Sequence, residues 1–315
     1  MKKAVFIYNP NSGKKNFRRN KIVTDFKKIE KIFNSYEYEV VFMKTKYAGH
    51  AKEIVSEVET VDLVVSLGGD GTFNEVVTGN LKRKDNLVLS HLPSGTTNDI
   101  GAMFGLGKNI YKNLHLLLSG QERKIDICLV NNQPFVYVAG FGKFMNIPYE
   151  TKRNLKKKIG YFAYLVNGAE DFLFNKTPLY EVTYEVDGEK YHGLYSFALI
   201  SNASRIAGIK NFYKNVTLND GKFEVLLCNL KKKQDIIKSL IYLKTSDITK
   251  VPGFYFHKTD HLKIKFIDKL KKPWCLDGEK MDGDIQEYDV TITNKIRMLV
   301  PNKMIDKLFV KESVK

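Results

Sequence analysis

The residues best suited to chemistry lie in residues 63–75, where an apolar run ends in three glycines within four positions. The run Leu-Val-Val-Ser-Leu predicts a buried strand, and Gly68-Gly69-Asp70-Gly71-Thr72 follows it at once. Glycine lets the backbone approach a ligand closely, and the N–H groups that open a helix carry positive partial charge. Thr72 and Glu75 have the spacing of a capping box, which predicts that a helix begins there. A tight turn needs only one glycine, so this stretch favours a phosphate-binding loop.

Two similar turns follow other apolar runs. Asn9-Pro10-Asn11-Ser12-Gly13 comes after residues 4–8, and Ser94-Gly95-Thr96-Thr97-Asn98-Asp99 comes after residues 87–92. Because the carboxyl ends of parallel strands meet at one sheet edge, the three turns should converge there, which favours a nucleotide site. The sequence contains neither a Walker A loop nor a GxGxxG fingerprint nor the motifs of protein kinases. P-loop ATPases, protein kinases and Rossmann dehydrogenases are therefore disfavoured.

Three aspartates stand at or just after the ends of expected strands. They are Asp70, Asp99 and Asp126. Mg²⁺ often keeps several waters and is held by few carboxylates, so the three could hold a hydrated ion against phosphate groups. Each aspartate could instead cap a helix, and for Asp99 alone this alternative has equal weight.

The pattern of apolar residues predicts two domains that position these groups. The first part of the chain predicts strands that alternate with helices. The strands are expected at 4–8, 38–43, 63–67 and 87–92, and the helices at 17–33, 48–58, 73–78 and 99–104. This alternation predicts an α/β domain with a parallel Rossmann-like sheet. The later part of the chain predicts a mainly antiparallel β domain, with a hairpin turn at Asp187-Gly188 and a helix at 160–173. Its strands are expected at 135–138, 180–186, 197–200, 223–227 and 288–292. We place the domains at 1–129 and 130–299, and we expect residues 300–315 to pack back on the first.

Composition narrows the class and the partners. The chain has 315 residues, 43% of them hydrophobic, and its 51 lysines and arginines exceed 35 acidic residues for a net charge of +16. Basic runs at 152–158, 231–233 and 269–272 could meet nucleic acid, an anionic membrane surface or phosphate-rich molecules, or they could form a solvated surface. No nucleic-acid-binding motif accompanies them, which disfavours nucleic acid.

The cysteines and the apolar runs predict a cytoplasmic, soluble protein. Cys128, Cys228 and Cys275 are far apart and form no CxxC pair, which is typical of a reducing compartment and disfavours a disulfide framework or a zinc site. The longest uncharged run has 16 residues, 127–142, whereas a membrane-spanning helix needs about 20 apolar residues.

Together these motifs resemble one family. Gly68-Gly69-Asp70-Gly71-Thr72 resembles the core motif of diacylglycerol kinases, sphingosine kinases, NAD kinases and phosphofructokinases. With residues 9–13, 93–99, Asn219-Asp220-Gly221 and Leu276-Asp277-Gly278-Glu279, the chain is similar to the soluble bacterial lipid kinases of the diacylglycerol kinase catalytic-domain family. The similarity extends in order over nearly the whole chain.

The resemblance implies a fold like that of phosphofructokinase and NAD kinase, with ATP in a cleft between the two domains and the lipid on the second. The implied ATP contacts are Asn9, Pro10, Asn11, Ser12, Gly13, Thr45, Gly68, Gly69, Asp70, Gly71, Thr72, Phe73, Asn74 and Thr96. Asp70, Asp99 and Asp126 would form a water-mediated network for the catalytic Mg²⁺, so Asp70 is counted with the catalytic residues. A structural Mg²⁺ would be held by Asp220 and the main chain of Thr217 and Lys222.

The resemblance also implies the reaction. The γ-phosphate of ATP would pass to a lipid hydroxyl, above all that of diacylglycerol to give phosphatidic acid, at the inner face of the cell membrane. Asp277 is expected as general base ahead of Glu279, although Asp277-Gly278 is by itself typical of a hairpin turn, and Lys158 matches a functional basic position.

Several alternatives stay open. They are an NAD kinase-like phosphotransferase and a non-catalytic lipid or nucleotide binder. Residues 202–208 and Gly142-Lys143 depart from the family pattern and leave open the acceptor lipid, which could also be phosphatidylglycerol or a sphingoid. The sequence does not distinguish a monomer from a homodimer.

Overall fold

The computed structural model describes residues 1–12, 25–95, 98–142, 178–206, 209–210, 212–230, 251–268, 270, 274–281 and 285–310. The chain divides into two compact units, which we call unit 1 (Met1–Ile125 with Asn294–Lys315) and unit 2 (Asp126–Thr293). The division thus falls just before the boundary expected after residue 129. The expected helix at 160–173 and the first part of the expected helix at 17–33 lie outside the described residues.

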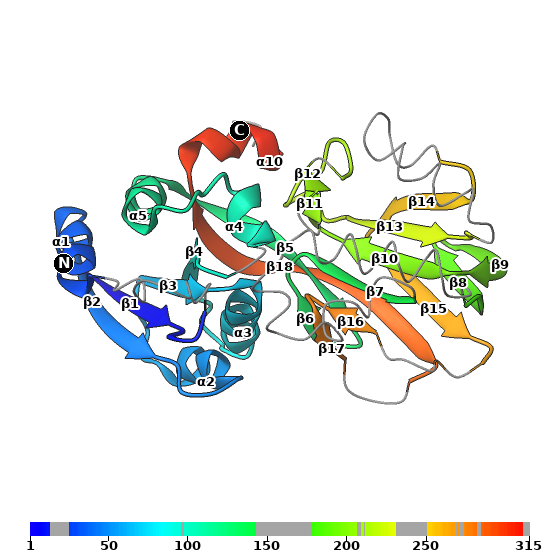
Figure 1. Ribbon diagram of the computed structural model, residues 1–315, viewed down its shortest axis with the longest axis horizontal. Coiled ribbons are helices and arrows are strands. Elements are labelled where there is room, and N and C mark those ends of the chain that lie inside the picture. The colour runs from blue at the N-terminus through cyan, green and yellow to red at the C-terminus, as the bar shows by residue number, and fades with distance from the viewer. Residues whose placement is uncertain are drawn as a thin grey trace, which may run out of the picture. The chain divides into compact units, whose positions relative to one another are not determined.

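The sheet of unit 1 is parallel. Its strands run in the order β2 (Tyr38–Lys44), β1 (Lys2–Tyr8), β3 (Leu63–Gly68), β4 (Val88–Pro93) and the second half of β18 (Glu287–Val300), as the blue to cyan strands and the red strand of Figure 1 show. All six residues of β3 are buried, as expected of a central strand between helices. The parallel α/β architecture expected from the sequence is therefore confirmed.

The α-helices of unit 1 each bury part of their residues, whereas its 3₁₀ helix buries none. They are α1 (Phe26–Ser35), α2 (His50–Glu57), α3 (Asp70–Leu81), α4 (Asp99–Met103), α5 (Ile110–Leu118), the 3₁₀ helix η2 (Asn302–Met304) and α10 (Ile305–Leu308). Phe6 of β1 lies edge-to-face against Phe33 of α1, with ring centroids 6.1 Å apart. Helix α5 was not predicted from the sequence, although Asn109 caps it by accepting a hydrogen bond from the N–H of Lys112.

The predicted capping box at Thr72 and Glu75 is wrong. Helix α3 begins three residues before the expected helix at 73–78, at Asp70, with Gly69 as its N-cap. The Glu75 carboxylate instead accepts hydrogen bonds from the N–H groups of Gly49 (2.9 Å) and Ala51 (3.1 Å), at the start of α2. Glu75 therefore caps the neighbouring helix rather than its own.

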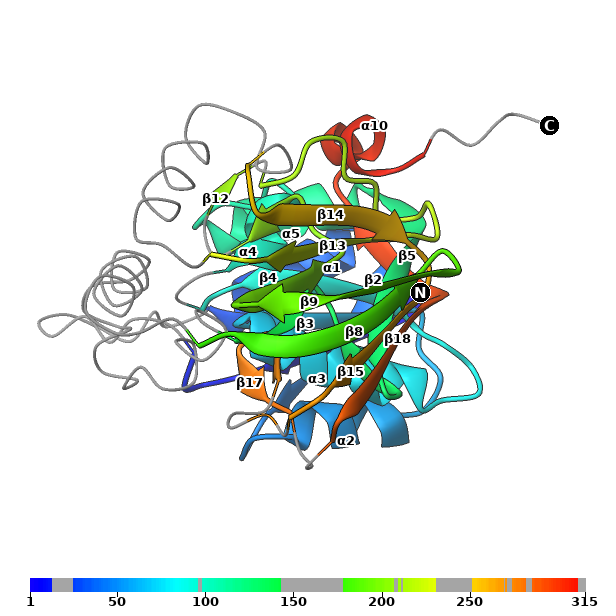
Figure 2. The ribbon, with the colours of Figure 1, turned by 90° about the vertical axis from the view of Figure 1, so that its right-hand side faces the viewer.

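Unit 2 is built mainly from antiparallel strands. One sheet has the order β14 (Phe254–Thr259), β13 (Phe223–Cys228), β10 (Phe197–Ser201), β7 (Val138–Gly142), β16 (Cys275–Leu276) and β17 (Glu279–Lys280). The first half of β18 pairs with β15 (Leu262–Phe266), which pairs with β8 (Tyr180–Val186), and β8 pairs with β9 (Glu189–Tyr195), as Figure 2 shows. Shorter strands are β5 (Gln121–Val130), which continues from unit 1, β6 (Gln133–Phe135), β11 (Arg205–Ile206) and β12 (Ile209–Lys210).

The predicted hairpin turn of unit 2 is confirmed. Val186 pairs with Glu189 across a two-residue turn, in which Asp187 and Gly188 both have positive φ (51° and 80°). Positive φ at both central residues is the conformation that Asp-Gly favours in such turns.

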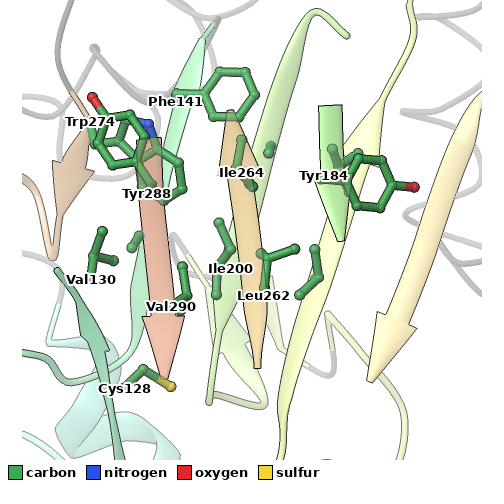
Figure 3. Close-up of a cluster of buried hydrophobic side chains, with 14 of the residues drawn as sticks. Cys128, Val130, Phe141, Tyr184, Ile200, Leu262, Ile264, Trp274, Tyr288 and Val290 are labelled. Carbon is green, nitrogen blue, oxygen red and sulfur yellow. The ribbon is translucent and has the colours of Figure 1, made fainter. Parts of the chain in front are cut away.

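The core of unit 2 combines side chains from both groups of strands. Ile200 comes from β10, whereas Leu262 and Ile264 come from β15, and all are buried in one cluster (Figure 3). Trp274 is fully buried and stacks on Tyr288, with ring centroids 4.3 Å apart and planes at 15°. Across the described residues, no helix is long and apolar enough to cross a membrane.

His91 is the buried ionisable group of the unit 1 sheet with the clearest shift. It lies on β4, is 1% exposed and packs on the ring of Phe73. Its Nδ1 is 2.9 Å from the hydroxyl of Ser66, whereas Nε2 has no hydrogen-bond partner among the described residues. Burial lowers the pKa of His91 to about 3, so the ring is neutral near pH 7.

We expect the stability of the protein to fall as the pH falls below about 6.5, in part because of His91. The unfolded chain takes up a proton at the ordinary histidine pKa, and the folded chain does not until about pH 3. Each pH unit in this window should cost about 1.4 kcal/mol of unfolding free energy. Denaturant unfolding of His91→Leu should show a shallower loss between pH 6.5 and 5 than the wild type.

His192→Gln is the matched control, because His192 lies on the exposed side of β9. Equal slopes for the wild type and His91→Leu would show that His91 does not contribute to the pH dependence.

Candidate functional site

The turns after β1, β3 and β4 lie together in unit 1. The N–H of Asn9 donates to the carbonyl of Leu67 (3.0 Å), and the N–H of Ser94 donates to the carbonyl of Gly68 (2.7 Å). The hydroxyl oxygens of Ser12 and Ser94 are 2.7 Å apart. The convergence expected from the parallel sheet is thus present in the structure, and we call these three turns the triple turn.

The space around the glycines of the triple turn differs from one position to the next. A Cβ atom on Gly95 would lie 2.7 Å from the Cα of Gly69, and one on Gly68 would lie 2.5 Å from the Cβ of Thr72. A Cβ atom on Gly71 would meet nothing within 4 Å. Packing within unit 1 therefore explains Gly68 and Gly95, whereas Gly71 leaves space in which a ligand can approach the start of α3.

Asp70 connects the triple turn to helix α4. Its carboxylate accepts hydrogen bonds from the N–H groups of Asp99 (3.1 Å) and Ile100 (3.3 Å). Both aspartates are almost fully buried, at 8% and 1% exposed. The N-cap residue of α4 is Asn98, in the left-handed conformation, so the helix-capping alternative for Asp99 is not what the structure shows. Asp70, from helix α3, accepts hydrogen bonds from the first two N–H groups of α4 instead.

The remaining expected ATP contacts of unit 1 lie on or near the triple turn. The side-chain amide of Asn9 donates to the hydroxyl of Thr72 (3.3 Å), and its carbonyl oxygen accepts from the N–H of Asn11 (2.9 Å). Thr45 follows β2 and donates its N–H to the carbonyl of Tyr8 (3.0 Å). Pro10 is exposed, Phe73 is buried and Asn74 is half-buried. Gly13 and Thr96 lie outside the described residues.

Asp126 lies at the start of unit 2, where its carboxylate, its N–H and its carbonyl each make a hydrogen bond. Its carboxylate accepts a hydrogen bond from the N–H of Gly221 (2.7 Å), and its own N–H donates to the carbonyl of Leu218 (2.8 Å). The side-chain amide of Asn202 donates to the carbonyl of Asp126 (2.8 Å). Burial raises the pKa of Asp126, the Gly221 N–H opposes this, and the charge of Asp220 adds to it.

The loop at residues 217–222 carries Asp220, which has three donors around its carboxylate. The hydroxyl of Thr217 and the N–H of Lys222 (3.2 Å) donate to it, and the ammonium nitrogen of Lys258 lies 2.7 Å from Oδ2. Lys258 also lies 3.6 Å from Glu224, whose pKa burial raises to about 7 against the opposing charge of Lys258. Glu224 and Lys258 were not predicted from the sequence, although an acidic residue inside the apolar run Phe-Glu-Val-Leu-Leu is a signal of a paired charge.

Asp277 is held by backbone N–H groups. Its carboxylate accepts from Val136 (2.6 Å), Tyr137 (3.0 Å) and Val138 (3.0 Å), and the side chain is 7% exposed. This explains why the strand expected at 135–138 is wrong. The segment forms two strands, β6 and β7, because these N–H groups point to Asp277 instead of to a neighbouring strand.

The turn that carries Asp277 joins β16 to β17. Leu276 pairs with Glu279, and both Asp277 and Gly278 have positive φ (50° and 91°), so the hairpin-turn interpretation is confirmed. Glu279, the other candidate base, is exposed. Lys143 and Lys158 lie outside the described residues.

Asp70 and Asp99 offer carboxylate oxygens that could hold a hydrated cation. Carboxylate oxygens are ligands that Mg²⁺ prefers, and Mg²⁺ keeps several of its waters. Within the described part of the chain, no group of three or more acidic, histidine or cysteine side chains is placed to hold a metal ion.

Comparison with known proteins gives a consistent result. The family model described as the diacylglycerol kinase catalytic domain matches residues 3–130. A diacylglycerol kinase of Bacillus subtilis (strain 168) is 28% identical over 98% of this chain and 99% of its own length. A diacylglycerol kinase of Staphylococcus aureus (strain MRSA252) is 27% identical over 97% and 95%.

Solved structures share the fold. The crystal structure of a diacylglycerol kinase from Bacillus anthracis (strain Sterne) aligns with a TM-score of 0.74 at 20% identity, over 96% of this chain and 98% of that one. Another structure from the same organism aligns with a TM-score of 0.79 at 22% identity, over 96% and 97%.

We expect Gly95→Ala and Gly71→Ala to have opposite effects on stability. The added methyl group at residue 95 would collide with backbone, which should lower the unfolding free energy by about 1–3 kcal/mol. At residue 71 it enters open space inside a helix, where alanine is up to about 1 kcal/mol better than glycine. Denaturant unfolding checks both variants, and a stable Gly95→Ala would refute the packing explanation.

Proposed function

Since the chain belongs to the diacylglycerol kinase catalytic-domain family and is therefore a lipid kinase, we propose that it transfers the γ-phosphate of ATP to the free hydroxyl of diacylglycerol, giving phosphatidic acid. The observation that carries this proposal is the triple turn, where three strand ends of a parallel sheet bring polar side chains to the start of α3. Such an arrangement suits a phosphate chain.

In this proposal the phosphates of ATP lie against the first turn of α3. Gly71 leaves space for them, and the positive end of the helix attracts their charge. Polar side chains from the triple turn can donate hydrogen bonds to phosphate oxygens, above all Asn9, Ser12 and Thr72. The other ATP contacts proposed from the resemblance are Pro10, Asn11, Gly13, Thr45, Gly68, Gly69, Asp70, Phe73, Asn74 and Thr96.

Asp70 and Asp99 would hold Mg²⁺ through water, together with Asp126 of unit 2. When bound, the ion neutralises the negative charge of the phosphates. The chain's own contribution is to fix the carboxylates. Asp70 is oriented by the N–H groups at the start of α4, and Asp126 by the N–H of Gly221.

Asp277 would accept the proton of the lipid hydroxyl. A general base of this kind contributes typically ~10²–10⁴ in rate. Three N–H donors hold its carboxylate in one orientation, which is the support the structure offers for this role over Glu279. Phosphoryl transfer otherwise depends on positioning and charge neutralisation.

The proposal predicts transfer of labelled γ-phosphate from ATP to diacylglycerol in mixed micelles containing Mg²⁺. Asp277→Asn should reduce the rate by about 10²-fold or more, and Glu279→Gln by much less, because only the first removes the proposed base. An asparagine amide would face one of the N–H groups with a donor, so thermal unfolding must show that the variant is folded. Near-wild-type activity of folded Asp277→Asn would refute the base assignment.

The same assay separates the alternatives. Phosphatidylglycerol, a sphingoid base and NAD serve as competing acceptors. We expect Gly71→Ala to fold and to have a raised KM for ATP, because its methyl group enters the space proposed for the phosphates. Label on NAD alone would favour an NAD kinase-like enzyme. ATP binding without transfer to any of these acceptors would favour a non-catalytic binder.

We further propose that the basic runs at 152–158 and 269–272 bring the enzyme to an anionic membrane surface, where its lipid lies. Their support is the sequence, because nearly all of these residues lie outside the described ones. Each lysine or arginine near such a surface contributes about 1 kcal/mol of attraction. Co-sedimentation with vesicles should increase with the fraction of anionic lipid and decrease with salt. Binding that responds to neither would refute membrane docking by charge.

A further inference from the structure

We propose that the ammonium group of Lys258 supplies the positive charge that compensates the loop at residues 217–222. It does so in the place where the family resemblance implies a structural Mg²⁺. The proposal concerns the folding of unit 2 and does not rest on which lipid accepts phosphate. It assigns to Lys258 the task of compensating the charge of Asp220 and of fixing the loop beside Asp126.

The strand register brings the lysine to this place. β13 and β14 pair antiparallel with Glu224 directly opposite Lys258. From there the lysine extends to the loop, with Nζ 2.7 Å from Asp220 Oδ2 and 3.6 Å from Glu224 Oε1. One ammonium group, which has three hydrogens to donate, thus serves two carboxylates.

The carboxylate of Asp220 is surrounded by donors. Oδ2 accepts from the Thr217 hydroxyl and from Lys258, and Oδ1 accepts from the N–H of Lys222. A Mg²⁺ ion would need a lone pair of the same carboxylate at about 2.1 Å, close to an ammonium group that repels it. The residues present therefore do not fit a divalent cation at this loop while Lys258 is there.

The loop in turn positions Asp126. Gly221 follows Asp220 directly, and its N–H donates to the Asp126 carboxylate at 2.7 Å. The carbonyl of Leu218, in the same loop, accepts a hydrogen bond of 2.8 Å from the N–H of Asp126. Lys258 is therefore a positioning residue. It holds the loop, and the loop holds a carboxylate that we propose for the catalytic Mg²⁺ network.

Metal content and thermal unfolding of the nucleotide-free protein test the proposal without any activity measurement. The protein is treated with EDTA, passed through a desalting column, and compared with untreated protein. We expect no stoichiometric metal in either sample and the same Tm with EDTA as with millimolar Mg²⁺. A tightly bound Mg²⁺ that survives desalting, with a Tm that falls on chelation, would overturn the proposal.

Lys258→Met provides the second arm, because it keeps the apolar stem and removes the charge. With two acidic groups left facing each other, Tm should fall by about 4–8 °C, and Mg²⁺ should restore part of the loss. Lys263→Met, on the exposed side of β15, is the matched control and should leave Tm unchanged. An unchanged Tm in Lys258→Met would overturn the proposal. If that variant does not fold, the chelation experiment on the wild type still decides.

Discussion

Hydrogen bonds from backbone N–H groups to carboxylates distant in sequence are the interaction on which both units depend. Asp277 receives three of them from the segment between β6 and β7, and Asp70 and Glu75 each receive two from the start of another helix. Each of these bonds joins a charge to N–H groups that the local secondary structure leaves unpaired. The same bonds stabilise the fold and orient the acidic side chains, so the candidate site and the scaffold cannot be separated.

Much of the fold could be predicted from the sequence, because apolar periodicity records burial. The first four strands of unit 1 in the chain are nearly continuous apolar runs, and the Asp187-Gly188 turn follows from local backbone preference alone. Strands β9 and β14 were missed because their polar and aromatic residues give no clear period. The capping box failed because Glu75 finds its partners on α2, and no local spacing reports a contact with another helix.

The candidate site was predictable only as far as its turns. The glycine-rich loops and their convergence follow from strand order, but the distinction between glycines required by packing and Gly71, which faces open space, needs coordinates. The pairing of Lys258 with Asp220 depends on the register of β13 and β14, which the sequence does not specify. When two charged side chains meet through tertiary contact, their spacing in the sequence does not indicate that they pair.

Strand β18 has a consequence for the order in which the chain can acquire its structure. Its residues Arg297 and Met298 pair with β4, yet they are encoded after all of unit 2. On the ribosome, the first 125 residues therefore emerge with one side of β4 lacking its neighbour, an open sheet edge of the kind that recruits foreign strands. The nascent chain must keep this edge covered or soluble until Arg297 and Met298 have been synthesised. Unit 1 therefore contains residues that are synthesised before the whole of unit 2 and residues that are synthesised after it.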